Sequence, residues 1–323
     1  MICIKNYSTD PYYNLALEEY LLKNYDKDIF MLWRNERSII VGKYQNTVAE
    51  INTDFVQKHQ LKIVRRITGG GAVFHDLGNI NFTFIKSKNN ADFHTFTEPI
   101  IQALNALGIP ATFQGRNDIA IYGQKISGNA QCIYENRILH HGTLLYSAQM
   151  NDLQEALLVN PLKFQGKSVQ SVRKRVTNIC DYLSSPMSVE QFIDYLYTYI
   201  IQHIPGTQYV SISKQDQSAI HQLRDKKYVT WEWNYGHSPQ FTFHKSAKTA
   251  GGIIEVFLDI SEGNIQSMHL CGDFFADQDI SKLEQYFFNK RYDLASLSEM
   301  LQSISISSYI RNVTNEEFLQ LLF

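Results

Sequence analysis

The chain has 323 residues, enough for about two domains of ordinary size, which excludes a peptide or a disulfide-stapled miniprotein. Hydrophobic residues make up 44% of the sequence and charged residues 19%, a composition typical of a folded globular protein and unlike that of a disordered chain. The 30 basic and 32 acidic residues leave a formal net charge of −2, so we predict neither nucleic acid nor a membrane as a partner.

The first part of the chain predicts a helix followed by short strands. Asp10 can cap the helix, Pro11 suits its first turn, and apolar residues then recur at a four-residue step. Runs rich in β-branched and aromatic residues come next. They predict strands at 29–33, 38–41 and 62–66, with a helical stretch at 54–59.

The middle of the chain continues this alternation without a regular βαβ rhythm. Residues 81–85 read as a strand, and a helix is predicted over 96–107, where a glycine and a proline end it. A turn at Gly123-Gln124 joins two further strands. These later strands are predicted at 118–122, 125–127 and 138–146. The pattern predicts an α+β fold with mixed, largely antiparallel sheets flanked by helices.

The last 80 or so residues are predicted to form a separate unit. Residues 253–260 and 265–270 have the pattern of a hairpin whose turn lies at 262–264. Capping-box spacing predicts one helix beginning at Ser188 and another beginning at Thr314. We therefore expect a large domain over 1–240 and a small C-terminal α/β domain over 241–323.

The cysteines and the first residues indicate the compartment. The four cysteines are too far apart for a CxxC pair, which argues against a zinc knuckle or a dense disulfide framework and favours a reducing environment. The opening MICIKNYSTD has no apolar core of a signal peptide, and no run of about 18 apolar residues occurs. We expect a cytoplasmic protein.

Three consecutive glycines are the most informative feature of the sequence. They separate two predicted strands within RRITGGGAVFHD, residues 65–76. Such a run marks a strained turn or a place where a ligand approaches main-chain N–H groups, because glycine leaves no side chain to bury. Arg66 beside it offers a forked cation for a phosphate or carboxylate. The pattern is not a Walker A loop, and a glycine-rich hairpin without a ligand is the alternative.

Lys125 is the second candidate. It follows the predicted turn and precedes the small-residue stretch ISGNA. A lysine in a turn is usually solvated surface, but Asp118 lies on the facing strand of the predicted hairpin and the glycine run offers a nearby anion site. The proximity of Asp118 and of the glycine run favours a functional lysine.

The adjacent His140 and His141 are the third candidate feature. Neighbouring residues of a strand point to opposite faces, so the two cannot chelate one metal ion from it, and we predict no metal site. Two interpretations stay open: one histidine is buried and the other exposed, or Gly142 and Thr143 line a pocket. The basic residues at 173–175 read either as a solvated face or as a site.

Together these segments resemble the lipoate-protein ligase family, ATP-dependent enzymes that attach lipoic acid to carrier domains. The match covers nearly the whole chain, and the joint spacing of its motifs is more specific than any one of them. Thr68 replaces the usual serine of the family motif RRxSGGGAVFHDxGN and keeps its hydroxyl. The matching segments are 65–79, 117–118, 125–130 and 140–145, with 252–258, 263 and 272–275 resembling the accessory domain of longer members.

The resemblance implies a fold shared with biotin protein ligases, followed by a small C-terminal α/β domain. It also implies two half-reactions. Lipoate attacks the α-phosphate of Mg²⁺-bound ATP to give lipoyl-adenylate and pyrophosphate, and a lysine of an acceptor protein then displaces AMP. The implied acceptors are lipoyl-domain proteins, namely the acyltransferase subunits of oxo-acid dehydrogenases or the glycine-cleavage H protein. The accessory domain could swing between the two half-reactions.

The resemblance also assigns roles to residues. Lys125 would bridge the lipoyl carboxylate and the α-phosphate, and Asp118 would orient Lys125 or meet the acceptor lysine. The nucleotide would be bound by Arg66, Gly70, Gly71, Ala72, Val73, Phe74 and Lys125. The lipoyl group would be bound by Lys125, Trp33, Gly42, Gly71 and His141.

Two other functions stay open. A lipoyl or octanoyl amidotransferase of the same fold would take the acyl group from a carrier protein as a cysteine thioester, without ATP. Cys132 is the cysteine near the motifs, and it reads either as that nucleophile or as a small buried hydrophobic residue. The second alternative is a non-catalytic binder that keeps the pocket of a ligase.

Overall fold

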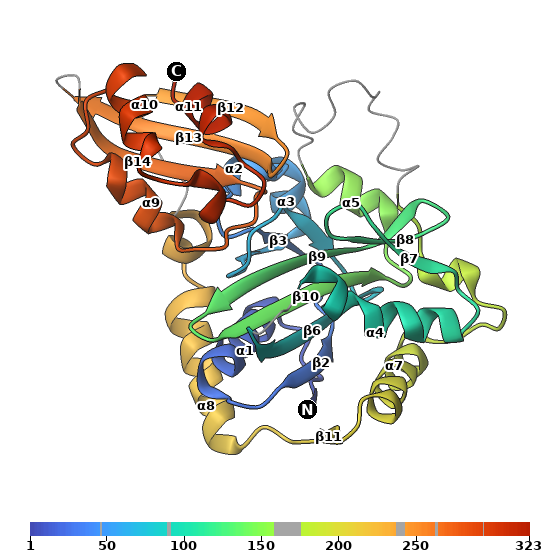
Figure 1. Cartoon of the computed structure of the whole chain (residues 1–323). Helices are drawn as coiled ribbons and strands as arrows, with labels where there is room; N and C mark the ends of the chain where they lie inside the picture. Colours follow the sequence, from blue (N-terminus) through green and yellow to red (C-terminus); the bar gives the residue numbers. More distant parts are fainter. Residues whose placement is uncertain (46, 89–91, 158–175, 237–242, 262–263, 293) are drawn as a thin grey trace.

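The computed structural model describes residues 1–323 apart from 46, 89–91, 158–175, 237–242, 262–263 and 293. Its centre is an eight-stranded mixed sheet. A second sheet of three strands lies beside the first, and a third, also of three strands, belongs to the C-terminal part, drawn in orange to red in Figure 1. None of the described helices is long and apolar enough to cross a membrane.

The large sheet is mostly antiparallel. Only two of its pairs, β1 with β11 and β1 with β2, are parallel. In spatial order its strands are β11 (Gln208–Tyr209), β1 (Ile2–Lys5), β2 (Ile29–Trp33), β6 (Asn79–Ser87), β10 (Arg137–Leu145), β9 (Gln124–Tyr134), β8 (Asp118–Ile121) and β7 (Ala111–Gln114). The predicted α+β class is confirmed.

Helices cover both faces of this sheet. They are α4 (Phe93–Ala106) and α7 (Val189–His203) on one face, and α1 (Pro11–Asn24) and α8 (Lys214–Leu223) on the other. Alternation along β2 shows why: Phe30 and Leu32 pack with α4 and α7, whereas Met31 and Trp33 pack with α1. The predicted caps are confirmed, since Asp10 accepts from the Tyr12 N–H and Ser188 forms a capping box.

Several boundaries differ from the predictions for local reasons. The helix expected at 96–107 begins at Phe93, because the Asp92 carboxylate accepts from the Thr95 N–H at 2.8 Å and caps it there. The β8–β9 turn lies at Tyr122-Gly123, one residue early, where both residues have positive φ (48° and 80°) as a tight hairpin turn requires.

The second sheet holds the glycine run. Its strands are β4 (Lys62–Arg65), β3 (Ser38–Val41) and β5 (Val73–His75), beside the short helices α2 (Thr47–Glu50), α3 (Thr53–His59) and α5 (Met150–Ala156). The run connects β4 to β5, yet these strands do not pair with each other. Both flank β3, β4 parallel to it and β5 antiparallel. The hairpin interpretation of the run is therefore wrong: the segment is a crossing loop.

The C-terminal part has its own antiparallel sheet and core. Its elements are β12 (Phe243–Thr249), β13 (Gly252–Ser261), β14 (Asn264–Gly272), α9 (Ile280–Phe287), α10 (Leu294–Gln302) and α11 (Asn315–Leu321). The predicted hairpin is confirmed as β13 and β14, although 262–263 of its turn lie outside the described residues. The capping box at Thr314 is also confirmed. The division at 240 and 241 stays a prediction.

Short helical turns complete the chain. They are η2 (Ile179–Tyr182), η3 (Arg224–Tyr228), η4 (Glu232–Gly236) and η5 (Ile306–Ser308). The turns η3 and η4 lie just before the C-terminal part and pack on the large domain. Their anchor is Asn234, whose side-chain oxygen accepts from the Arg65 N–H at 2.8 Å. The segment that leads to the C-terminal sheet is thus fixed to β4, the strand that precedes the glycine run.

Candidate active site

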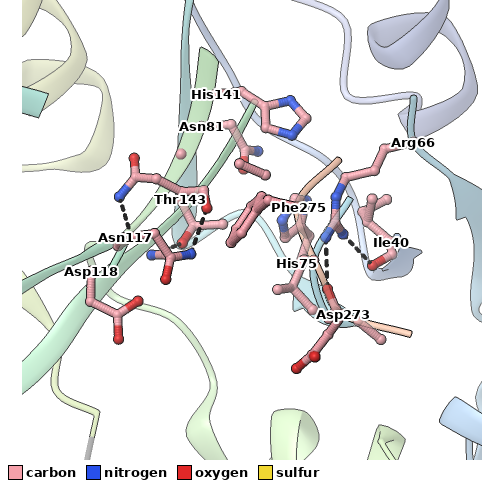
Figure 2. A pocket seen from close by; sticks show the side chains of 18 of the residues that line it. Ile40, Arg66, His75, Asn81, Asn117, Asp118, His141, Thr143, Asp273 and Phe275 are labelled. Atoms are coloured by element: carbon pink, nitrogen blue, oxygen red, sulfur yellow. Dashed lines mark hydrogen bonds between the residues drawn. The ribbon is translucent and has the colours of Figure 1, made fainter. Parts of the chain in front are cut away.

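A cavity of about 270 Å³ opens between the glycine run and strands β8 to β10 (Figure 2). The loop after β14 completes its wall with Asp273 and Phe275. The residues predicted for the site that line it are Trp33, Arg66, Gly70, Gly71, Ala72, Val73, Asp118, Lys125 and His141. Gly142 and Thr143, the pocket option raised from the sequence, line it too.

Two residues expected in the site are not among the described lining residues. The side chain of Phe74 packs with Ile39 and Val41 on the other side of the small sheet, since successive strand residues alternate between faces. Gly42 lies behind the glycine run, where a Cβ would come 1.9 Å from the Gly70 carbonyl oxygen. Gly42 thus allows the close approach of two loops.

Lys125 and Asp118 form an ion pair across the β8–β9 hairpin. Their Nζ and Oδ1 atoms are 2.8 Å apart, and the side chains are 40% and 35% exposed. The ammonium lies over Gly128, where a Cβ would come 2.9 Å from Nζ. An ion pair this exposed contributes at most about 1 kcal/mol to stability. Its effect is to hold a cation at the mouth of the cavity.

Arg66 shapes the glycine loop from within. Its guanidinium is almost fully buried and donates to the carbonyl oxygens of Gly69 and Gly71, at 2.7 and 2.8 Å, and to that of Ile40. Burial lowers the pKa of Arg66 to about 10, so the group keeps its charge at neutral pH. Gly70 adopts a left-handed φ of 92°, which favours glycine. The loop therefore carries a fixed positive charge beneath it.

Both histidines of β10 are buried, so the interpretation with one exposed is wrong. The strand lies in the middle of a sheet covered on both faces. His140 stacks on Phe96, with ring centres 4.8 Å apart, and hydrogen-bonds Gln131 and Asn129. His141 points to the other face and lines the cavity (Figure 2). The pair occupies opposite faces, as predicted.

Glu18 on α1 organises the wall that His141 belongs to. This buried carboxylate lies 3.0 Å from Nδ1 of His141, and Nε2 of His141 lies 2.8 Å from Oγ1 of Thr68. It also accepts from the Thr83 hydroxyl, which accepts in turn from the indole N–H of Trp33 at 2.8 Å. Sequence reasoning missed Glu18. Two adjacent glutamates in a helix whose other packed residues are mostly apolar were the available signal.

Replacing Glu18 with glutamine should raise the KM for the ligand of this cavity roughly thirtyfold, because hydrogen bonds to a charged acceptor are worth about 2 kcal/mol and each 1.36 kcal/mol is a factor of ten. Glu19 provides a matched control: its carboxylate is also buried but pairs with Lys23 and Lys227, away from the cavity. Glu19→Gln should lower the melting temperature and leave KM unchanged. Steady-state kinetics of both variants test this, and equal KM values would contradict it.

Arg116 and the C-terminal loop form the outer wall. The guanidinium carbon of Arg116 lies 4.6 Å from the ring centre of Phe275, and Arg116 donates to the Gly251 carbonyl. The Phe275 ring also meets Phe93 edge to face, with centres 5.2 Å apart. Arg116 and the C-terminal pair were missed as site residues. Arg116 could have been found from its position directly before Asn117-Asp118. Nothing local marked Asp273 and Phe275 as residues of this site.

Cys132 lies outside this cavity. Burial raises the pKa of its thiol to about 12, so the sulfur stays protonated at neutral pH. Among the described residues, no group of three or more His, Cys, Asp or Glu side chains is placed to hold a metal ion. The basic residues at 173–175 lie outside the described residues.

Family comparisons agree with this geometry. Residues 10–201 match the family model described as the lipoyl protein ligase A/B catalytic domain, and residues 238–322 match the bacterial lipoate protein ligase C-terminus. The fold and the site thus define an acyl-ligase catalytic domain with its accessory domain. The chain belongs to the lipoate-protein ligase family.

Similar proteins cover the full length of the chain. The lipoate-protein ligase LplJ of Bacillus subtilis is 39% identical over 100% of both chains, and lipoate–protein ligase 1 of Staphylococcus aureus is 39% identical over 98% of both. Among solved structures, that of P. falciparum LipL1 in complex with lipoate has a TM-score of 0.81, with 28% identity over 99% of this chain and 97% of that one. A lipoate-protein ligase A bound with ATP has a TM-score of 0.64 and 27% identity over 73% of this chain and 98% of its own.

Proposed function

We propose that the chain activates lipoate with ATP to lipoyl-AMP and then transfers the lipoyl group to a lysine of a lipoyl-domain protein. One observation carries the proposal: the Lys125–Asp118 pair faces a glycine loop across a cavity whose inner wall includes Trp33. Joining two anions requires cations and N–H dipoles where charge accumulates, and this site offers both beside an apolar surface for an acyl chain.

In the first half-reaction, a lipoate carboxylate oxygen attacks the α-phosphorus of ATP, and the bond to the β-phosphate oxygen breaks to release pyrophosphate. Lys125 neutralises the carboxylate and the α-phosphate together. The backbone of 70–74 binds the nucleotide. Arg66 contributes through the loop that its guanidinium shapes and through its buried charge.

In the second half-reaction, the amine of the acceptor lysine attacks the acyl carbon, loses a proton and expels AMP. Asp118 is half-exposed at the cavity mouth beside Lys125, so it orients that ammonium and meets the incoming amine. The acceptors we propose are acyltransferase subunits of oxo-acid dehydrogenases or the glycine-cleavage H protein. A solved structure 29% identical to this chain comes from a structural analysis of an archaeal lipoylation system, a bi-partite lipoate protein ligase and its E2 lipoyl domain from Thermoplasma acidophilum.

We propose that Mg²⁺ enters with the nucleotide. Its oxygen ligands then come mainly from the phosphates and water, as is usual for this ion. The described residues contain no cluster of metal-binding side chains, which is compatible with that route. The C-terminal loop at Asp273 and Phe275 lines the same cavity, so we propose that the accessory domain moves between the half-reactions.

The test is ATP-dependent modification of a recombinant lipoyl domain. Purified protein, lipoate, Mg²⁺-ATP and the domain should give an acceptor whose mass has increased by one lipoyl group. Omitting ATP or chelating Mg²⁺ should abolish the change. Modification without ATP from a lipoylated donor protein would instead establish an amidotransferase.

Replacing Cys132 with alanine should leave ATP-dependent lipoylation within about twofold of the wild type. The half-buried thiol lies outside the cavity, and its raised pKa opposes formation of a nucleophilic thiolate. Mass spectrometry of the acceptor checks the rate. A complete loss of transfer, with the melting temperature unchanged, would instead support the amidotransferase mechanism with a thioester at Cys132.

A further inference from the structure

His75 presents a hydrogen-bond donor to the cavity that no described residue accepts. The side chain is 2% exposed and lines the cavity, and its Nε2 atom is buried without a hydrogen-bond partner among the described residues. A buried donor left unpaired costs free energy, so such a group in a ligand cavity indicates an acceptor on the ligand.

Hydrogen bonds behind the ring fix which nitrogen carries the proton. The side-chain nitrogen of Asn14 donates to the carbonyl oxygens of Ser8 and Arg34, which can only accept. This nitrogen cannot accept, so the Asn35 atom 2.8 Å from it is the carbonyl oxygen Oδ1, which shares one of the two amide hydrogens. The amide nitrogen of Asn35 then faces Nδ1 of His75 at 3.0 Å and donates to it. His75 is left with its proton on Nε2, the atom toward the cavity.

The ring also stays neutral. Burial, together with the nearby Arg66, lowers the pKa of His75 to about 3. Near neutral pH the group is therefore an uncharged N–H donor rather than a cation. The carboxylate and the phosphates of the substrates have the cations elsewhere in the site as partners, which leaves this neutral donor for another acceptor.

His75 lies on the side of the cavity that includes Trp33 and Ile40, with the buried Arg66 nearby. Its ring meets that of Trp33 edge to face, with centres 6.2 Å apart, and Ile40 and Val73 line the cavity too. In Figure 2, His75 lies on the side of Ile40 and Arg66, away from Asp118 and hence from its partner Lys125. We place the far end of an acid whose carboxylate meets Lys125 against this wall.

We propose that His75 selects lipoate over octanoate by donating its Nε2 hydrogen to a dithiolane sulfur. This inference rests on the proposed function. Lipoate and octanoate share the carboxylate and an eight-carbon chain and differ near the far end, where lipoate has two sulfur atoms. Divalent sulfur is a weak hydrogen-bond acceptor, whereas a methylene accepts none. Octanoate would leave the donor unpaired, and a site with an unpaired polar group rejects the substrate that lacks the partner.

The experiment compares kcat/KM for lipoate and octanoate in ATP-dependent transfer. The wild type should prefer lipoate, and His75→Phe should lower the lipoate-to-octanoate ratio by roughly three- to tenfold, mainly through the lipoate KM. His75→Gln should restore much of the ratio, because an amide can accept from Asn35 and still donate to the cavity. The exposed His203 provides the matched control, and His203→Gln should leave the ratio unchanged.

NMR spectroscopy of the wild type tests the proposal even if His75→Phe does not fold. With ¹⁵N-labelled histidine, the His75 ring of the wild type, assigned by its absence in His75→Gln, should show Nε2 protonated. Its shift should move on adding lipoate but much less on adding octanoate. Equal loss of both activities in His75→Phe, or equal shifts with both acids, would overturn the proposal. Absence of any ATP-dependent transfer by the wild type would instead overturn the proposed function.

Discussion

Replacing Lys125 with alanine should lower the rate of lipoyl transfer by about three orders of magnitude. A unit-charge contact at about 4 Å contributes roughly 4 kcal/mol at an effective dielectric constant near 20, and each 1.36 kcal/mol is a factor of ten in rate. The loss should appear in pyrophosphate exchange as well as in acceptor modification, because the lysine acts when the adenylate forms. Mass spectrometry and an exchange assay measure the two steps.

The fold should not suffer from this change. The Lys125–Asp118 pair is more than a third exposed at both partners, so its removal should shift the melting temperature by no more than about 2 °C. Lys282→Ala, at an exposed position of α9, controls for the loss of a charge. Asp118→Asn should retain adenylation better than transfer if the carboxylate meets the acceptor amine. Exchange activity near the wild-type level in Lys125→Ala would refute the assignment of this residue.

Replacing Arg65 with methionine should lower the free energy of unfolding by about 4 kcal/mol or more. The side chain is fully buried and binds backbone segments that lie far apart in the sequence. Its guanidinium donates to the carbonyl oxygens of Gly42, Lys43, Gln45, Trp233 and Asn234 and to the hydroxyl of Thr47. Methionine fills the volume but leaves several buried acceptors without donors, each costing about 1–3 kcal/mol.

Thermal unfolding measures the Arg65 effect. For a domain of this size, a change of 4 kcal/mol lowers the melting temperature by roughly 8–16 °C. Arg65→Lys should recover only part of it, since one ammonium cannot replace the planar fork. Burial lowers the pKa of Arg65 to about 10, so the guanidinium stays charged and keeps its hydrogen bonds at neutral pH. A melting temperature within 2 °C of the wild type would contradict this account.

Arg65 and Arg66 show how adjacent, chemically identical residues take different roles. Consecutive positions at the end of β4 send their side chains to opposite sides. Arg65 fixes η4, the turn before the C-terminal part, whereas Arg66 holds the carbonyl groups of the glycine loop. Both residues belong to the same sequence motif. Only the packing distinguishes Arg65, which has a structural role, from Arg66, which lies beneath the site.

The sequence by itself determined the elements and the chemistry-bearing motifs. Strands β2 and β3 have the predicted bounds, because their β-branched and aromatic residues are bordered by polar ones. The caps at Asp10, Ser188 and Thr314 were readable because each is a hydrogen bond within three residues. The family motifs likewise lie in short segments, so their spacing was visible without a fold.

Only the tertiary structure decided how those segments meet. The placement of β4 and β5 on either side of β3, the burial of both histidines and the contact of Glu18 with His141 depend on pairing between distant strands and helices. The same holds for Phe275, which reaches the cavity from a position far along the chain. The physical reason is that local hydrogen bonds and periodicity are fixed within a few residues, whereas the burial of side chains depends on which faces pack together.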